Sequence, residues 1–323
     1  MSMKYGQVPG VDKPISRIVQ GVIQVDRNNE EGAMAHMDAV LETGINAVDT
    51  ALIYGSDAFL GKWLASRGVR DQVVILAKGA HPNQWRNKVT PYDISADLHD
   101  TLAAMKVDFV DLYVLHRDDE EWPVEPIVDT LNKHVKEGKI KAFGGSNWTT
   151  ARLAEANAYA KASGQVPFAV SSPNFSLADQ IEEPWGGCIS ISGSKNEAER
   201  AWYLEKNMPI FAWSSMAGGF WSGRYTRENL QDTEDKVYGK LVQRCYASED
   251  NFKRLDRVRE LGAAKGATVP QIALAFLMNH PLNMFALVGS ANKEELTANV
   301  AAVDITLTPQ EMDYLDLKAD SPA

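Results

Sequence analysis

The sequence predicts an α/β fold, a single closed (β/α)₈ TIM barrel with long loops at the C-terminal face of its strands. Three observations predict it. Short apolar segments alternate with helical segments roughly eight times along the chain. Most of these segments are almost continuously apolar, as expected for strands that are covered on both faces. No linker rich in Ser, Gly or Pro divides the 323 residues, so we expect one domain over 1–323.

The elements follow one another in order along the chain. Thr90 precedes Pro91, and apolar residues then recur at helical spacing up to Met105, which predicts a capped helix. Thr268 with Gln271 and Thr308 with Glu311 have the spacing of a capping box at a helix start. The expected strands are 18–24, 46–50, 73–77, 109–115, 140–144, 168–172, 210–213 and 285–288.

The competing fold is an open, doubly wound sheet. Such a sheet would carry a Gly-rich phosphate-binding turn after its first strand, and the segment 20–24 lacks that pattern. Two regions, 177–198 and 214–247, interrupt the regular alternation and follow expected strands. We therefore expect both to project from the C-terminal mouth of the barrel, where long loops shape binding sites.

Composition narrows the class of protein. The formal net charge of -10 argues against a nucleic-acid partner, because phosphate binding needs clustered Lys and Arg. The two cysteines, Cys188 and Cys245, are far apart without metal-ligand spacing, which favours a reduced, cytoplasmic protein. We expect no membrane association, since no signal-peptide core or bilayer-spanning apolar run is present, and we take a monomer as the default.

Four polar residues follow or end expected strands two, three and four: Asp49, Tyr54, Lys78 and His116. Singly, each has an ordinary explanation as a packing residue, a helix cap or a solvated charge. In a parallel barrel, however, side chains at the C-terminal strand ends converge on one mouth. We therefore expect these four to form one site.

Reduction of a carbonyl by hydride transfer needs this set of groups. A free tyrosine has a pKa of about 10 and donates its proton poorly. We expect the Lys78 ammonium to stabilise the Tyr54 phenolate and bring that pKa toward working pH, with Asp49 holding Lys78 in place. His116 would donate a hydrogen bond to the carbonyl oxygen.

The chain resembles the aldo-keto reductase family from about residue 15 to residue 318. The segments that carry the resemblance are 46–55, the strand ending at Lys78, 111–116 and Gly144-Gly145-Ser146-Asn147-Trp148. The resemblance implies Asp49, Tyr54, Lys78 and His116 as the catalytic tetrad, with Tyr54 as general acid. It also implies NADP(H) or NAD(H) lying extended across the barrel mouth.

The resemblance further implies the cofactor contacts. The nicotinamide carboxamide would be held after the fifth and sixth strands, its ring would stack on an aromatic residue after the seventh, and a loop would pass over the pyrophosphate. The adenosine end would meet a helix N-terminus, which favours anionic groups. The implied residues are Ser146, Asn147, Ser172, Trp213, Ser214, Ser215, Met216, Gly218, Gly289, Ser290, Asn292, Glu295 and Asn299.

Two of these positions depart from the family pattern. Ser172 stands where a longer Gln is usual, and Glu295 stands where many members carry Arg or Gln near the adenine ribose. A carboxylate repels a 2′-phosphate but accepts a hydrogen bond from a free 2′-hydroxyl. NADP(H) is the expected cofactor with Lys293 supplying charge, and NAD(H) is the alternative because of Glu295.

The expected substrate is a small aldehyde or ketone, including sugar and aryl carbonyls. Aromatic residues that could line the mouth are Trp85, Trp185, Phe220 and Trp221. The segment 117–119 either contacts substrate hydroxyls or forms a solvated turn, and no Arg/Lys cluster favours a phosphorylated or carboxylated substrate.

Two other functions stay open. One is a cofactor-binding regulatory barrel with slow turnover, like a channel subunit. The other is a metal-dependent lyase or isomerase, for which only Asp49 and His116 are candidate ligands.

Overall fold

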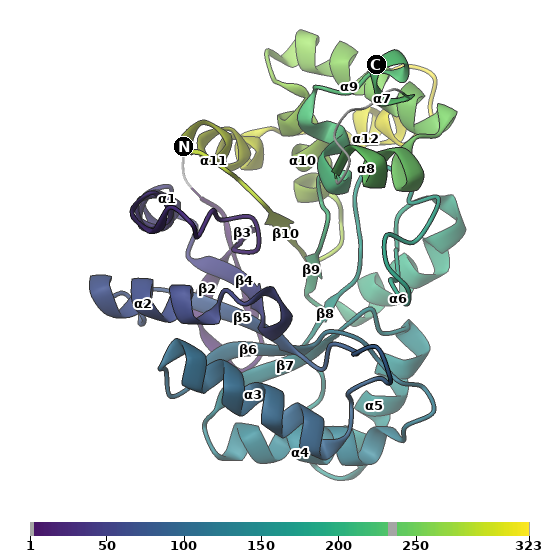
Figure 1. Cartoon of the computed structure of the whole chain (residues 1–323). Coiled ribbons are helices and arrows are strands. Elements are labelled where there is room, and N and C mark those ends of the chain that lie inside the picture. Colours follow the sequence, from purple (N-terminus) through teal and green to yellow (C-terminus); the bar gives the residue numbers. More distant parts are fainter. Residues whose placement is uncertain (1–2, 232–237, 323) are drawn as a thin grey trace.

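The structure, a computed structural model, describes residues 3–231 and 238–322. Eight strands form a closed barrel in which each strand pairs in parallel with its neighbours, in the order β10-β3-β4-β5-β6-β7-β8-β9 (Figure 1). The predicted fold is therefore confirmed. The barrel strands are β3 (Ile18–Gly21), β4 (Ala47–Ala51), β5 (Val74–Gly79), β6 (Val110–Leu115), β7 (Ile140–Ser146), β8 (Val170–Ser172), β9 (Ile210–Ala212) and β10 (Met284–Val288).

Each expected strand coincides with one barrel strand, and the differences lie at the ends. The first expected strand, 18–24, is too long, because β3 ends at Gly21 and a turn begins in which the Val25 N–H donates to the Val22 carbonyl. The fifth, 140–144, is too short, because β7 continues to Ser146 by pairing with Ser172 of β8. Apolar runs locate strands well, but the hydrogen bonds that end them depend on neighbours distant in sequence.

An N-terminal hairpin was not predicted. Strands β1 (Tyr5–Val8) and β2 (Val11–Ser16) pair antiparallel. Val8, Val11 and Ile15 are buried in the cluster of side chains that fills the barrel interior. The hairpin therefore adds apolar side chains to the barrel interior. Two phenyl rings from adjacent strands, Phe211 and Phe285, stack in the same cluster with centroids 4.5 Å apart.

Helices surround the barrel, as Figure 1 shows for α1 to α6. The predicted caps are present: the Thr90 hydroxyl accepts from the Asp93 N–H, and the Glu311 carboxylate accepts from the Thr308 N–H. The helices are α1 (Glu30–Glu42), α2 (Asp57–Arg67), α3 (Pro91–Met105), α4 (Val124–Lys136), α5 (Thr150–Ala162), α6 (Glu197–Lys206), α7 (Arg227–Gln231), α8 (Tyr238–Tyr246), α9 (Glu249–Lys265), α10 (Val269–Asn279), α11 (Lys293–Ala301) and α12 (Pro309–Leu315). Short 3₁₀ helices are η1 (Leu52–Tyr54), η2 (Ser194–Asn196), η3 (Ala217–Ser222) and η4 (Ala302–Asp304).

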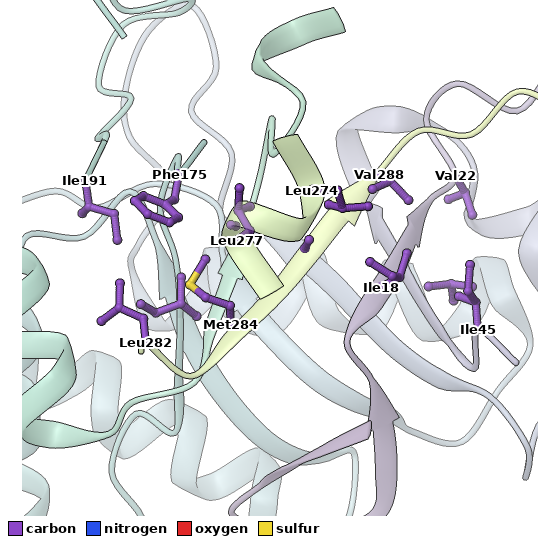
Figure 2. Packing of buried hydrophobic residues seen from close by; sticks show 14 of the residues in the cluster. Ile18, Val22, Ile45, Phe175, Ile191, Leu274, Leu277, Leu282, Met284 and Val288 are labelled. Atoms are coloured by element: carbon purple, nitrogen blue, oxygen red, sulfur yellow. The ribbon is translucent and has the colours of Figure 1, made fainter. Parts of the chain in front are cut away.

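The larger apolar core lies between the barrel and its helices. Figure 2 shows part of it, where Leu274 and Leu277 of α10 lie against β10, near Val288 and Met284. This packing holds β10 against α10, and β10 leads directly into the segment before α11.

Within the described ranges, no single helix is both long and apolar enough to cross a membrane. Helices α9 and α10 meet the length and composition test only as a pair, and they are bent by 95°.

Candidate active site

The four predicted catalytic residues come from three adjacent barrel strands and the segments that follow them. Asp49 lies within β4 and Lys78 within β5, while Tyr54 ends η1 and His116 directly follows β6. The register pairs Ala51 of β4 with Lys78 of β5, and Asp49 with Leu76. Lys78 therefore lies nearer than Asp49 to the C-terminal ends of the strands. The four side chains lie together: Asp49, Lys78 and His116 are buried, and Tyr54 is partly buried.

Lys78 and Asp49 form a buried ion pair at the base of the site. The Lys78 Nζ donates a hydrogen bond to Asp49 Oδ1, and both residues are at most 5% exposed. Burial by itself would lower the pKa of Lys78, but attraction by Asp49 and then Tyr54 outweighs burial and raises it. Lys78 is therefore a fixed ammonium.

Tyr54 lies above this ammonium, with the Lys78 Nζ 5.4 Å from its ring centroid. Burial raises the pKa of Tyr54, and the Lys78 charge opposes that rise without cancelling it. Lys78 thus acts in the predicted direction, but the expected net fall in the Tyr54 pKa is wrong, because desolvation of the phenolate outweighs the nearby charge. Tyr54 is a protonated phenol over the neutral pH range.

His116 meets the Tyr54 ring edge to face, with centroids 5.7 Å apart. Burial, and then the charge of Lys78, hold the pKa of His116 well below its usual range. The ring is therefore neutral at neutral pH and carries one N–H. His81, which sequence reasoning missed, packs against the His116 ring with centroids 4.8 Å apart and also lowers the pKa of His116.

The predicted carboxamide contacts, Ser146 and Asn147, belong to a buried polar network. The Ser146 hydroxyl donates to the Ser172 carbonyl, and the Asn147 amide donates to Ser146 Oγ and to the His116 carbonyl. The Ile189 N–H donates to Asn147 Oδ1. Asn147 has a positive φ of 59°, which this network holds in place. These contacts fix both side chains beside His116.

Ser172 and Trp213 lie on the two strands beyond this network. The Ser172 hydroxyl donates to the Phe211 carbonyl, so its hydrogen is used inside the barrel. Trp213 follows β9, is partly exposed, and packs on the cluster that fills the barrel interior. Its Nε1 is buried without a hydrogen-bond partner among the described residues. Trp213 thus presents a partly exposed indole at the end of its strand.

The loop after Trp213 turns sharply. Ser214, Ala217, Gly218 and Gly219 all have positive φ. The N–H groups of Ala217 and Gly219 donate to the carbonyls of Ser214 and Met216, so the loop is closed by its own hydrogen bonds. Ser215 anchors the loop, because its buried hydroxyl donates to the Leu287 carbonyl at 2.5 Å.

The predicted adenosine end is formed by the segment between β10 and α11. Ser290 is fixed by the Asn299 amide, which donates to its hydroxyl, and by Gln20, which donates to its carbonyl. Asn292 caps α11 by accepting from the Glu295 N–H. A surface pocket of about 530 Å³ opens here, lined by Gly32, Ala35, His36, Asp38, Ala39, Glu42, Ala291, Asn292 and Lys293.

The two charged residues of this end are engaged with the protein itself. The Glu295 carboxylate accepts from the Ala291 N–H at 2.8 Å, and the Lys293 ammonium lies 3.4 Å from Glu42. The Lys293 ammonium, which was expected to supply positive charge at the cofactor, therefore faces the Glu42 carboxylate.

Three arginines lie at or near the mouth, and sequence reasoning singled out one of them. Arg117, in the segment expected to contact substrate hydroxyls or to form a solvated turn, is not part of a solvated turn, because it is only 8% exposed. Arg27 and Arg224 were missed. Arg27, after β3, donates to the Tyr54 carbonyl, and the Nη2 of Arg224 lies 3.5 Å from the position that a Cβ atom at Gly219 would take.

The group with metal-ligand spacing found among the described residues consists of His99, His134 and Glu137. It lies on α3 and at the end of α4, on the outer helices rather than at the barrel mouth. Asp49, one of the two candidate ligands at the mouth, is paired with Lys78 instead.

Comparison with known proteins decides the family. The model of the Aldo/keto reductase family matches residues 17–320. The chain belongs to the aldo/keto reductase family. As a member it is an NAD(P)H-dependent carbonyl reductase, so the resemblance in sequence and the predicted enzyme class are both confirmed.

Curated relatives agree with this assignment, and a solved structure shares the fold. The chain is 26% identical over 304 residues to a putative aryl-alcohol dehydrogenase, AAD14, of Saccharomyces cerevisiae, covering 89% of this chain and 77% of that one. It is 27% identical to the aryl-alcohol dehydrogenase [NADP(+)] of Phanerodontia chrysosporium, covering 89% and 76%. The structure of the glycerol dehydrogenase AKR11B4 from Gluconobacter oxydans, 20% identical, has a TM-score of 0.80 over 98% of this chain and 95% of that one.

Proposed function

We propose that this aldo/keto reductase reduces an aldehyde or ketone to an alcohol, with Tyr54 as the general acid. The observation that carries the proposal is the arrangement of Tyr54 over the buried Lys78–Asp49 ion pair, with the neutral His116 ring edge-on beside it. A nicotinamide cofactor supplies the hydride in this chemistry.

Each of the four residues has a distinct proposed role in carbonyl reduction. Tyr54 delivers a proton to the alkoxide that develops from the carbonyl, and the Lys78 ammonium stabilises the phenolate left behind. Asp49 keeps Lys78 charged and in place inside the barrel. His116, being neutral, can donate its single N–H to the carbonyl oxygen. Ser146 and Asn147 are the residues proposed to hold the nicotinamide amide, with Trp213 against its ring.

An aryl or other apolar carbonyl compound fits the rim of the mouth best. Trp85, in the segment after β5, is 80% exposed, and Trp185, in the loop after β8, is 58% exposed. Ile53 and Ile23, after β4 and β3, are also exposed. Phe220 and Trp221 are fully buried, so these two aromatics pack the loop instead. Similarity to two aryl-alcohol dehydrogenases supports the same substrate class.

For the cofactor, we propose a preference for NAD(H) over NADP(H). The family uses either, and one relative is named for NADP(+). In this chain the Glu295 carboxylate takes the Ala291 N–H at the head of α11, and Lys293 is paired with Glu42. The Glu295 charge disfavours a 2′-phosphate, whereas a carboxylate accepts a hydrogen bond from a free 2′-hydroxyl. The proposed preference for NAD(H) reverses the NADP(H) default expected from the family alone.

The test combines binding and turnover. Fluorescence of Trp213 is titrated with NADH and NADPH, and the reduction of a simple aryl aldehyde is then followed by loss of reduced cofactor. Quenching together with steady turnover supports the reductase. Quenching without turnover would favour the regulatory barrel, a reading also suggested by 24% identity to a probable voltage-gated potassium channel subunit beta of Oryza sativa subsp. japonica.

A further inference from the structure

The guanidinium of Arg117 is a buried positive charge at the mouth of the barrel. The residue follows His116 directly and is 8% exposed. Its Nη1 donates to the His116 carbonyl at 2.9 Å, and its Nη2 contacts the Cys188 Sγ at 3.1 Å. A third, longer contact joins Nε to the Gly186 carbonyl at 3.5 Å. Three of its five N–H donors are thus engaged, all with uncharged acceptors.

The acidic residues near Arg117 have other partners. Asp118, the next residue, forms an ion pair with Arg152 at 3.0 Å. Glu183, on the loop that carries Cys188, accepts from the Gly187 N–H. Among the described residues, no carboxylate oxygen lies within the 4.0 Å of an ion pair with Arg117. A buried charge is ordinarily paired, because desolvation without a counter-charge is costly. The missing counter-charge therefore points to a ligand.

Arg117 is also close to the reacting groups. Its charge lowers the pKa values of Tyr54, His116 and His81, so its field reaches the place where the carbonyl must lie. Its two contacts in the loop after β8, Gly186 and Cys188, line a pocket of about 580 Å³. Arg117 is thus linked to this pocket through two of its lining residues, and the lining also includes Glu182 and Glu183.

We propose that Arg117 binds a carboxylate of the substrate, so that the preferred substrate is an oxo acid whose carbonyl lies a few bonds from the carboxylate. The inference rests on the proposed function and adds a carboxylate to the aryl or other apolar carbonyl compound proposed there. One guanidinium matches the single negative charge of a carboxylate, and its planar donors fit both oxygens. A phosphate, with close to two negative charges at neutral pH, would call for a second cation. This assignment differs from the sequence expectation, which found no basic cluster and so no anionic substrate.

The test uses matched substrates that differ only in charge. 4-Carboxybenzaldehyde is compared with 4-formylbenzamide, and 4-oxobutanoate with 4-oxobutanamide. We expect the wild-type enzyme to have a kcat/KM at least tenfold higher for each acid than for its amide. Arg117→Met should lower kcat/KM for the acids by about 10²- to 10³-fold, mainly through KM. It should lower kcat/KM for the amides by a clearly smaller factor, because the same charge also acts on Tyr54 and His116. Arg117→Lys should restore part of the acid preference.

Controls separate charge recognition from structure. Cys188→Ala removes one contact of Arg117 but keeps its charge, so the acid preference should persist. 4-(Hydroxymethyl)benzoate, a product analogue, should inhibit the wild-type enzyme more tightly than its amide and lose that advantage in Arg117→Met. Thermal unfolding of each variant shows whether it is folded.

Each other outcome is informative. Equal wild-type kcat/KM for acid and amide, or equal loss on both in Arg117→Met, would overturn the inference while leaving the reductase intact. A preference for a phosphorylated aldehyde over the carboxylated one would overturn the choice of carboxylate. Absence of turnover with every carbonyl, together with absence of Trp213 quenching, would instead reject the proposed function itself.

Discussion

Individual side chains at the mouth have protonation states that follow from burial and from one fixed charge. Lys78 is held as an ammonium by Asp49, while burial keeps Tyr54 protonated and His116 neutral. A proton donor above an ammonium, beside a neutral N–H donor, is suited to reduction at neutral pH. In the reverse direction, alcohol oxidation needs the Tyr54 phenolate.

That requirement predicts the pH dependence of a lysine variant. Wild-type alcohol oxidation should accelerate as pH rises toward the Tyr54 pKa, and reduction should slow above it. Lys78→Met removes the charge that lowers this pKa, so the rising limb for oxidation should move up by at least about one pH unit. The measurement is kcat/KM for an aryl alcohol between about pH 7 and pH 11.

A second variant controls for folding, because Lys78→Met leaves Asp49 buried without its partner. The double variant Asp49→Asn, Lys78→Met removes both charges and should unfold at a temperature closer to that of the wild type. Its kcat/KM for alcohol oxidation should rise with pH over the same displaced range as in Lys78→Met. An unchanged limb in both variants would mean that Lys78 does not act on Tyr54.

Glu295 gives a residue-scale prediction about the cofactor. Replacement by Gln keeps the length of the side chain but removes the charge next to the head of α11. Because an exposed charge acts modestly, we expect Glu295→Gln to tighten NADPH binding about two- to fivefold and to change NADH binding less than twofold. Calorimetric titration of both cofactors measures this. Tighter wild-type binding of NADPH than NADH would contradict the proposed preference.

Among the elements, apolar runs located the eight barrel strands and capping residues located helix starts. Contacts between residues distant in sequence set the strand ends, and the N-terminal hairpin was not predicted. That Asp49, Tyr54, Lys78 and His116 would lie together was predictable, because Asp49, Lys78 and His116 lie in or directly after apolar strands. The burial of Arg117 was not, since it depends on Gly186 and Cys188, about seventy residues away. The hydrogen bond from the Ala291 N–H to the Glu295 carboxylate was likewise not predictable, because it depends on the conformation of the loop before α11.

The stacked pair inside the barrel predicts a stability effect. Phe285 of β10 is fully buried against Phe211 of β9, and the hairpin packs in the same cluster. Phe285→Ala should lower the free energy of unfolding by about 3–5 kcal/mol, because it leaves a cavity that neighbouring strands cannot fill. Tyr92→Ala, at a site 78% exposed on α3, is the matched control and should change it by less than about 0.5 kcal/mol. Urea denaturation compares them, and equal effects would show that the interior does not depend on this pair.

At the scale of the whole molecule, closure of the barrel brings together groups far apart in the chain. Tyr54, His116, Asn147 and Trp213 come from different strand ends, and closing β10 against β3 places Ser290 beside Gln20. The proposed reaction needs all of these strand ends at one mouth, so the site exists only in the closed barrel. Within that site, we propose that the proton comes from Tyr54.

The measurement that tests this claim most directly is the turnover number of Tyr54→Phe, taken alongside its cofactor affinity by Trp213 fluorescence. Removing one hydroxyl leaves the ring packing against His116 and the ammonium below it. We expect kcat for aldehyde reduction to fall by about 10²- to 10⁴-fold, roughly 3–5.5 kcal/mol in barrier height, with cofactor affinity within about threefold of wild type. Near-wild-type turnover with intact cofactor binding would contradict the role of Tyr54 as proton donor.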